Sequence, residues 1–350
     1  PEGPRRDVGP LAGITIATFW PTDGNFVAFT ATQGLWRTDG TPEGTFPLGS
    51  ATPWTGAQSY IPALSPRSVA AFGGLLFAKI NGSGLNAPVD LYFTDGTVEG
   101  TRVAADTLPS RVYGTVIGSL SPLPGGRLFF SAKTQEEGTE PWVSDGTAEG
   151  THLLADLMPG PGDWSGRGLG SDDSHAYFLA DDGVTGLELH STDGTPEGTR
   201  TFDLTPGPVG SFTSSSFPSP GIDAQHAAQG DRLLFVGPGG LRSCDGQDTQ
   251  VIVPTGAGGY TGFKAVTASP GGGWYAFGLL AGNAKRILAL DGTPGGTRTL
   301  ASFTGTVWAP FVENGRSLFF GFGPTGQSQG LGILDLDTPD SARMLVSGNW

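Results

Sequence analysis

The sequence predicts an all-β protein, a seven-bladed β-propeller with repeats of about 50 residues. Three observations predict it. A seven-residue motif recurs along the whole chain, short apolar segments flanked by Gly or Asp recur with it, and no segment shows the 3.6-residue period of an amphipathic helix. Because a fixed period over 350 residues outweighs the length, which alone would suggest several domains, we expect a single domain over residues 1–350.

The recurring motif is Asp-Gly-Thr-x-x-Gly-Thr, and the longer string TDGTPEGT is identical at 38–45 and 192–199. Five copies are intact, and two worn copies complete the period. The motif Asp of the seven repeats is Asp39, Asp95, Asp145, Asp193, Asp245, Asp291 and Asp337. Asp can accept backbone N–H bonds in an Asx-type turn and Gly allows a positive φ, so the motif predicts the connection between the third and fourth strands of each blade. Turns spread around one rim cannot converge, so we interpret the motif as scaffold rather than as a metal or catalytic site.

Each repeat contains four strand-like segments, which together make one antiparallel blade. The second segment is the clearest, since it is short and rich in Phe, Tyr and Leu. Its seven copies are 25–31, 75–80, 127–132, 176–180, 232–236, 274–280 and 317–322. The first strand is apolar and rich in small residues, the third leads into the motif and the fourth leaves it. Examples are 13–19 and 116–120 for the first strand, 34–37 and 140–143 for the third, and 151–156 and 199–204 for the fourth.

The composition excludes several function classes. With 33 acidic and 19 basic residues the formal net charge is −14, so nucleic acid would be repelled and is not an expected partner. The single Cys244 excludes an internal disulfide, and the absence of any run of 18 apolar residues predicts no transmembrane segment. A start at Pro1 without Met or signal peptide is typical of a trimmed domain or mature region. Short strand edges and the acidic charge predict a monomer.

Segments 34–41 (GLWRTDGT) and 140–147 (EPWVSDGT) resemble the signature of the ELWxxDGT-repeat family of bacterial surface and secreted proteins. The resemblance continues at 156–160 (DLMPG) and 203–207 (DLTPG), which are similar to the Asp-Ile-x-Pro-Gly continuation of that family. It implies a β-propeller that a bacterium secretes or displays at its surface, with no common activity. The Trp position of the signature drifts along the chain: it holds Trp36, Tyr92, Trp142, His190, Arg242, Leu288 and Leu334.

A ligand site is expected on the rim opposite the motif, where the loops between strands two and three and the blade-to-blade connections vary in length. Each connection carries one aromatic residue at a similar place. The series is Tyr60, Tyr113, Trp164, Phe212, Tyr260, Trp308 and the last residue, Trp350. Exposed rings on a rigid rim could stack on sugars or grip an apolar peptide side chain, so the series predicts a glycan, peptide or protein ligand. The alternative is that each ring packs between blades as part of the core.

Other residues on that rim allow weaker interpretations. A group of carboxylates could hold Ca²⁺ or serve a hydrolase or lyase, but its spacing matches no calcium-loop pattern, so a solvated acidic edge without cofactor is expected. These carboxylates are Glu136, Glu137, Glu140, Asp181, Asp182 and Glu188. The four His residues, His152, His175, His190 and His226, show no metal-ligand spacing, although His175 and His190 could meet on adjacent strands. Cys244 has no basic neighbour in sequence to activate it.

Three functions therefore remain open. The leading prediction is an extracellular binding module that uses the aromatic rim. The second is a hydrolase or lyase with an acidic or His site on the same rim, and the third is a structural cell-surface module. A binding module predicts exposed aromatic rings, an enzyme predicts acid and base groups that converge, and a spacer predicts buried rings.

Overall fold

The computed structural model describes twelve stretches of the chain: 16–21, 26–31, 34–48, 75–80, 89–103, 118–134, 136–145, 149–162, 167–212, 225–323, 330–338 and 342–347. The chain divides into two compact units. One unit comprises Pro1–Gly170 with Asp193–Thr199, and the other comprises Ser171–Thr192 with Arg200–Trp350. The single domain over 1–350 stays a prediction.

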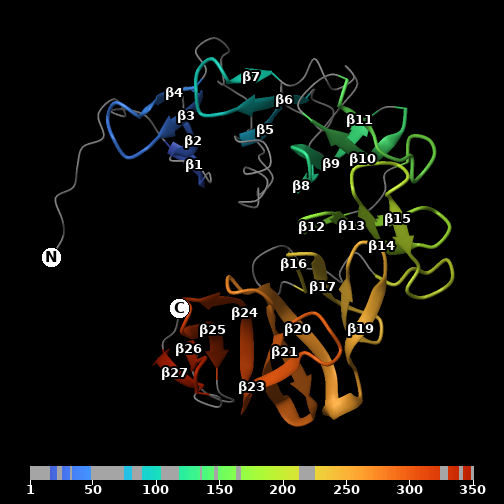
Figure 1. Cartoon of the computed structure of the whole chain (residues 1–350), viewed down its shortest axis with the longest axis vertical. Coiled ribbons are helices and arrows are strands. Elements are labelled where there is room, and N and C mark those ends of the chain that lie inside the picture. Colours follow the sequence, from blue (N-terminus) through green and yellow to red (C-terminus); the bar gives the residue numbers. More distant parts are fainter. Residues whose placement is uncertain are drawn as a thin grey trace. The chain divides into compact units, whose positions relative to one another are not determined.

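The described strands form seven antiparallel sheets that follow one another along the chain (Figure 1). Six sheets have four strands in chain order, and the sheet β5-β6-β7 has three described strands. The first three sheets are β1 (Ile16–Pro21), β2 (Val27–Ala31), β3 (Gly34–Thr38) and β4 (Phe46–Pro47); β5 (Leu75–Ile80), β6 (Val89–Thr94) and β7 (Arg102–Val103); β8 (Gly118–Leu123), β9 (Arg127–Thr134), β10 (Gly138–Ser144) and β11 (His152–Leu153).

The next four sheets are β12 (Arg167–Ser171), β13 (Ala176–Asp181), β14 (Leu187–Thr192) and β15 (Arg200–Phe202); β16 (His226–Gln229), β17 (Arg232–Gly237), β18 (Gly240–Cys244) and β19 (Thr249–Pro254); β20 (Tyr260–Ala268), β21 (Trp274–Leu280), β22 (Ala284–Leu290) and β23 (Thr297–Thr304); β24 (Thr306–Glu313), β25 (Ser317–Gly323), β26 (Gly330–Asp335) and β27 (Arg343–Ser347). Two short 3₁₀ turns, η2 (Ala257–Gly259) and η3 (Ala281–Asn283), precede β20 and β22. The prediction of an all-β protein with repeated four-stranded antiparallel sheets is confirmed.

The motif forms a turn that closes on itself between the third and fourth strands. Asp39 Oδ1 accepts the backbone N–H of Thr41 at 2.9 Å and its hydroxyl at 2.6 Å, and these bonds hold the pKa of Asp39 below its usual value. The Thr41 hydroxyl accepts the N–H of Gly44 at 3.0 Å, and the Thr41 carbonyl accepts the Thr45 hydroxyl at 2.6 Å. The carboxylate makes the same two bonds to Thr at Asp95, Asp193 and Asp291. This is the Asx-type turn that the sequence predicts.

The turn requires Gly at both glycine positions of the motif. Gly40 has φ +89°, a conformation that costs a residue with a Cβ about 1–2 kcal/mol. Gly44 lies beneath the Asp39 carboxylate, and a Cβ there would be 2.0 Å from Oδ1. The polar groups of the motif therefore form hydrogen bonds within their own turn, in agreement with the scaffold interpretation.

In the last sheet the turn is formed by Asp335, two residues before the predicted Asp337. Asp335 Oδ1 accepts the N–H of Asp337 at 2.9 Å, which is the bond that Asp39 accepts from Thr41. Asp335 also pairs with Ser317, the first residue of β25. The sequence misplaced the turn because this copy contains three Asp residues, at 335, 337 and 340, and no Gly to mark the turn.

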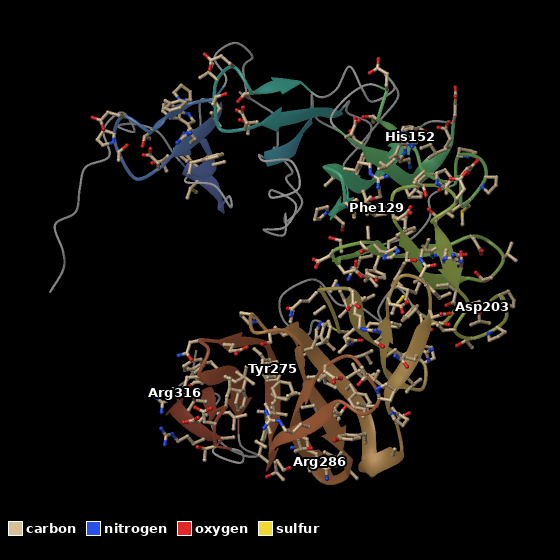
Figure 2. All side chains as sticks on the ribbon, viewed as in Figure 1. Phe129, His152, Asp203, Tyr275, Arg286 and Arg316 are labelled. Atoms are coloured by element: carbon tan, nitrogen blue, oxygen red, sulfur yellow. The ribbon has the colours of Figure 1, made fainter. Side chains whose placement is uncertain are left out.

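Neighbouring sheets of the second unit pack through apolar faces. One core cluster joins β16–β19 to β20–β23 and includes Leu234 and Trp274. Another joins β20–β23 to β24–β27 and includes Tyr275 (labelled in Figure 2), Phe277 and Phe320. Apolar residues of the second strands thus contribute to both clusters.

Candidate functional site

In a four-stranded meander the loop between strands two and three lies at the same end of the sheet as the connection that follows strand four. We call this end the connection edge, and the end that carries the Asp-Gly-Thr turns the motif edge. Since the motif turns use their own polar groups internally, the connection edge is the better candidate for a binding site. It is described in sheets β8–β11, β12–β15, β16–β19 and β20–β23, and the two with the longest described connections are β8–β11 (134, 136–138 and 154–162) and β12–β15 (181–187 and 203–212).

A buried carboxylate anchors the connection of sheet β8–β11. Glu140 on β10 is 0% exposed, and its two oxygens accept the backbone N–H groups of Leu157 at 2.9 Å and Met158 at 3.1 Å. The same connection lies against the start of β10, because a Cβ at Gly138 would be 1.8 Å from the carbonyl oxygen of Gly162. The loop is thus held to the strand both by contact and by hydrogen bonds.

Sheet β12–β15 repeats this arrangement. Glu188 on β14 is 0% exposed and accepts the hydroxyl of Ser211 at 2.6 Å and the N–H of Leu204 at 3.3 Å. The N–H groups of Ser211 and Phe212 also donate to the carbonyl of Leu187 at 3.1 and 3.2 Å. We call Glu140 and Glu188, with the connections they hold, the carboxylate latches. The sequence did not predict that Glu140 and Glu188 are buried, because both were expected to lie on a solvated acidic edge.

Burial makes the two latch carboxyl groups weaker acids than an ordinary Glu. It raises the pKa of Glu140 to about 7, although the N–H groups of Leu157 and Met158 work in the opposite direction. Burial also raises the pKa of Glu188, against the hydrogen bond from Ser211. The N–H donors favour the charged carboxylate, but burial favours the neutral form and is the larger effect.

We expect the stability of the protein to depend on pH through Glu140. Its pKa in the folded protein lies above the ordinary value of 4.5, so the folded state holds the proton more tightly. The resulting stabilisation is fully present below pH 4.5 and is lost as the pH rises through about 7. Relative to Glu140→Gln, the free energy of unfolding should fall by about 2–3 kcal/mol over this interval. Urea titrations of both proteins across this pH range measure the difference, and a constant difference would show that Glu140 titrates normally.

Most of the predicted aromatic rim lies outside what the structure describes. Tyr60, Tyr113, Trp164 and Trp350 are outside the described residues, and for Trp308 only the backbone in β24 is described. The remaining two rings are in the core. Phe212 is 5% exposed with its ring centroid 6.2 Å from that of Phe235, and Tyr260 is 8% exposed and 5.2 Å from Phe263. For these two, the alternative of packing between sheets holds, and they are not the exposed rings that a binding rim requires.

The Asp residues between β13 and β14 are used by their own loop. Asp181 Oδ1 accepts the N–H of Gly183 at 2.9 Å, and Asp182 Oδ1 accepts those of Val184 at 2.8 Å and Thr185 at 2.7 Å. Among the described residues, no group of three or more His, Cys, Asp or Glu side chains is arranged to hold a metal ion. Binding of Ca²⁺, the weaker alternative to an edge without cofactor, has no support from Asp181 and Asp182.

The loop before β10 also forms hydrogen bonds within itself. The N–H of Glu137 donates to the hydroxyl of Thr134 at 3.0 Å, and that hydroxyl donates to the Glu137 carboxylate. The neighbouring Glu136 is exposed.

The His residues of sheet β12–β15 do not meet. His190 is 0% exposed, pairs with Phe178 in the ladder and stacks on its ring at 5.1 Å. Burial lowers the pKa of His190 to about 4, so it is neutral at pH 7. His175 lies on the motif edge instead, where a Cβ at Gly246 would be 2.3 Å from its ring. His152 is exposed and His226 half-buried.

Cys244 and the polar groups near it have a structural role. The Cys244 thiol is 0% exposed, and burial raises its pKa to about 12. The Tyr177 hydroxyl donates to the buried Asp172 carboxylate at 2.5 Å and contacts the Cys244 carbonyl at 3.4 Å. Because Cys244, His190, Glu140 and Glu188 are all fully buried, none of them reaches a substrate in this structure.

No family model matches the sequence, and no curated protein matches it. The resemblance to the ELWxxDGT repeat therefore rests on the motif residues alone. No helix in the described part of the chain is long and apolar enough to cross a membrane.

The solved structures that this chain is similar to include peptidases. Prolyl oligopeptidase B from Galerina marginata bound to a 25mer macrocyclization substrate is 9% identical, with a TM-score of 0.49 over 95% of this chain and 51% of that chain. A prolyl endopeptidase is 12% identical, with a TM-score of 0.48 over 95% and 50%. A puromycin hydrolase is 17% identical, with a TM-score of 0.44 over 89% and 50%. The chain spans about half the length of these proteins.

Proposed function

We propose that this chain is a protein-binding propeller module, and that its ligand is an apolar, basic peptide segment of a partner that docks on the connection edge. The observation that carries the proposal is a pair of exposed valines in sheet β12–β15. Val184 is 72% exposed and Val209 is 87% exposed. Exposed apolar side chains that lie together on one edge are typical of interaction sites.

The two valines lie on loops that touch. Val184 belongs to the loop between β13 and β14, and Val209 belongs to the connection after β15. A Cβ at Gly186 would be 2.5 Å from the backbone N of Gly210 and 2.8 Å from the carbonyl carbon of Val209. Glu188 holds the second loop through Ser211. A latched loop loses little conformational entropy on binding, which favours affinity.

The charge around the valines indicates the partner. Segments 181–187 and 203–212 contain Asp181, Asp182 and Asp203 but no Lys or Arg. Asp203 is exposed and is labelled in Figure 2. An acidic surround attracts a segment with Lys or Arg and repels an acidic one, which gives specificity and a faster association rate. The net charge of −14 acts in the same direction.

The test is selection from a phage-displayed library of random peptides on the immobilised chain. We expect the enriched peptides to combine apolar and basic residues, and the affinity of a synthetic copy to fall about tenfold or more in a Val184→Ser, Val209→Ser double variant. Val98→Ser is the matched control, because Val98 is 47% exposed but lies in a motif turn. Failure to enrich any peptide, or equal affinity for the double variant, would overturn the proposal.

The predicted aromatic rim is kept as a separate candidate surface for a sugar ligand. Rings that stack on a sugar would come from Tyr60, Tyr113, Trp164, Trp308 and Trp350. A glycan array distinguishes the two ligand classes: saccharide binding that is lost in Trp164→Ala but kept in the valine variant would replace the peptide with a sugar.

We also propose that the chain is an ELWxxDGT-repeat protein that is secreted or displayed on a bacterial surface. The motif residues 34–41 and 140–147 support this. Fractionation of the source cells with an antibody against the chain tests it, and a signal confined to the cytosol would contradict it.

A further inference from the structure

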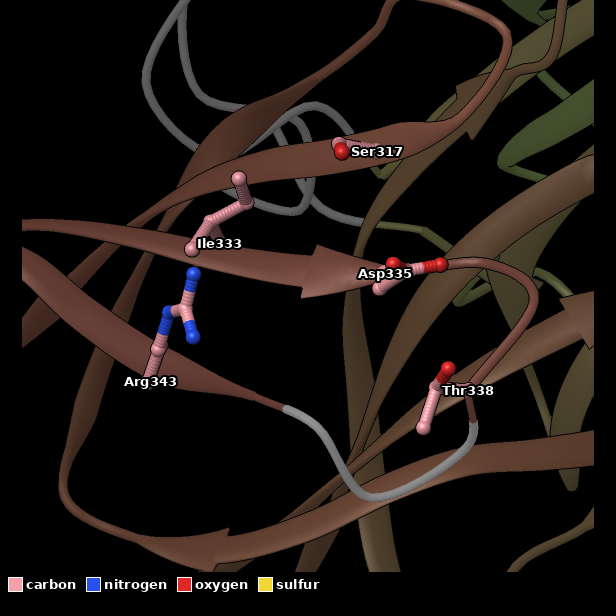
Figure 3. A pocket seen from close by; sticks show the side chains of 5 residues that line it. All are labelled: Ser317, Ile333, Asp335, Thr338 and Arg343. Carbon is pink, nitrogen blue, oxygen red and sulfur yellow. The ribbon is translucent and has the colours of Figure 1, made fainter.

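The last sheet of the second unit carries a cavity of about 290 Å³ on its motif edge (Figure 3). Strands β25, β26 and β27 line it, together with the turn between β26 and β27. The lining residues are Ser317, Ile333, Asp335, Thr338 and Arg343. Small-molecule sites usually measure about 300–1,000 Å³, so this cavity fits a ligand at the small end of that range.

The ladders place four of these side chains on one face of the sheet. Ser317 pairs with Asp335 between β25 and β26, and Ile333 pairs with Arg343 between β26 and β27. Because Ile333 and Asp335 are two residues apart on one strand, both pairs project from the same face. Leu334 points to the opposite face and belongs to the core cluster shared with β20–β23. A ligand in the cavity therefore displaces nothing from that cluster.

The cavity contains one positive group, the guanidinium of Arg343. Figure 3 shows it pointing toward Ile333. Among the described residues, this guanidinium has no hydrogen-bond or ion-pair partner. Its planar set of N–H donors matches a carboxylate, which it can bind through two parallel hydrogen bonds.

The negative group of the cavity is the carboxylate of Asp335. The turn fixes its orientation, because Oδ1 accepts the N–H of Asp337 at 2.9 Å. The hydroxyls of Ser317 and Thr338 line the same cavity. An ammonium group has three N–H donors, and one carboxylate with two hydroxyls can supply three acceptors for them.

The spacing of the two charges limits the ligand. Asp335 and Ile333, toward which the guanidinium points, stand about 7 Å apart along β26. Two hydrogen bonds of about 2.9 Å each take up most of this distance, so the two charges of the ligand must lie close together. A simple anion is repelled by the net charge of −14, whereas a ligand with one charge of each sign is not.

We propose that this cavity binds a free α-amino acid with an aliphatic side chain. Arg343 binds its carboxylate, Asp335 binds its ammonium group, and Ile333 contacts its side chain. The site lies on the motif edge, whereas the valine surface lies on the connection edge, so this proposal does not depend on the proposed function.

The probe is L-leucine, titrated at pH 7 into the ¹⁵N-labelled chain. We expect saturable shifts of the amide signals of Ser317 and Thr338, with a dissociation constant of about 1 mM or below. The affinity should fall about tenfold or more in Arg343→Ala. It should be unchanged in Arg316→Ala, the matched control, because Arg316 is an exposed arginine of the same sheet (Figure 2) and does not line the cavity. Equal Tm values show that both variants fold.

Analogues of leucine test each contact separately. Leucinamide lacks the carboxylate and 4-methylpentanoate lacks the ammonium group, and each should bind about tenfold or more weakly than leucine. Asp335→Asn keeps an acceptor for the N–H of Asp337 but removes the negative charge. In this variant, leucine should lose its advantage over 4-methylpentanoate.

Three results would overturn the proposal. The first is the absence of saturable shifts with leucine, and the second is equal affinity of Arg343→Ala and the parent chain. The third is parent affinity for leucinamide or 4-methylpentanoate that equals the affinity for leucine, since the cavity would then recognise a single charge rather than an amino acid.

Discussion

Replacing Phe277 with alanine is expected to lower the free energy of unfolding by about 4 kcal/mol. Phe277 on β21 is 0% exposed and belongs to the cluster that joins β20–β23 to β24–β27. Its ring centroid lies 4.4 Å from that of Phe311, 5.9 Å from Phe320 and 6.4 Å from Phe303. Removal of the ring leaves a cavity that four strands of two sheets would have to close. Ladders fix these strands, so they can relax little.

Urea denaturation followed by tryptophan fluorescence measures the loss. Leu279→Ala is the matched control, because Leu279 lies on the same strand but is only half-buried, and about 2 kcal/mol or less is expected. Phe277→Leu refills most of the space and should recover more than half of the loss. A loss for Phe277→Ala no larger than that for Leu279→Ala would show that this cluster does not hold the two sheets together.

The strands that the sequence predicted best are those with the most apolar side chains. The second strand of the second repeat was predicted at 75–80, and β5 is Leu75–Ile80. The two fourth strands predicted at 151–156 and 199–204 are shorter in the structure, at His152–Leu153 and Arg200–Phe202. β11 is His152–Leu153 rather than 151–156, and a few residues later the N–H groups of Leu157 and Met158 donate to the Glu140 side chain instead of to a strand.

The latches were beyond sequence reasoning for a physical reason. A Glu in an acidic chain is expected to be exposed to solvent. The burial of Glu140 depends instead on N–H donors that lie 17 and 18 residues later in the chain. One signal was available. Both Glu140 and Glu188 stand five residues before a motif Asp and are followed by an Asp-Leu-x-Pro-Gly segment. A carboxylate that recurs with a specific loop sequence indicates a bond between the two, whereas scattered acidic residues do not.

Replacing Gly210 with alanine is expected to cost about 3 kcal/mol or more, and to weaken binding at the connection edge in protein that still folds. Gly210 has φ +74°, and a Cβ there would lie 2.3 Å from the backbone N of Leu187. Because the obstacle is backbone in a ladder rather than a movable side chain, the connection itself has to shift. Val209 moves with it, so one substitution strains the fold and displaces the proposed contact.

Gly230→Ala separates strain from displacement. Gly230 lies in the turn between β16 and β17, outside the valine surface; its φ is +62°, and a Cβ there would meet nothing within 4 Å. The substitution should therefore cost only the left-handed backbone conformation, about 1–2 kcal/mol, and leave peptide affinity within about twofold of the parent. Urea titration and peptide binding are measured on both variants. If Gly210→Ala and Gly230→Ala lose equal stability and bind the selected peptide equally, the connection is not pinned to β14, and the valine surface does not depend on the latch.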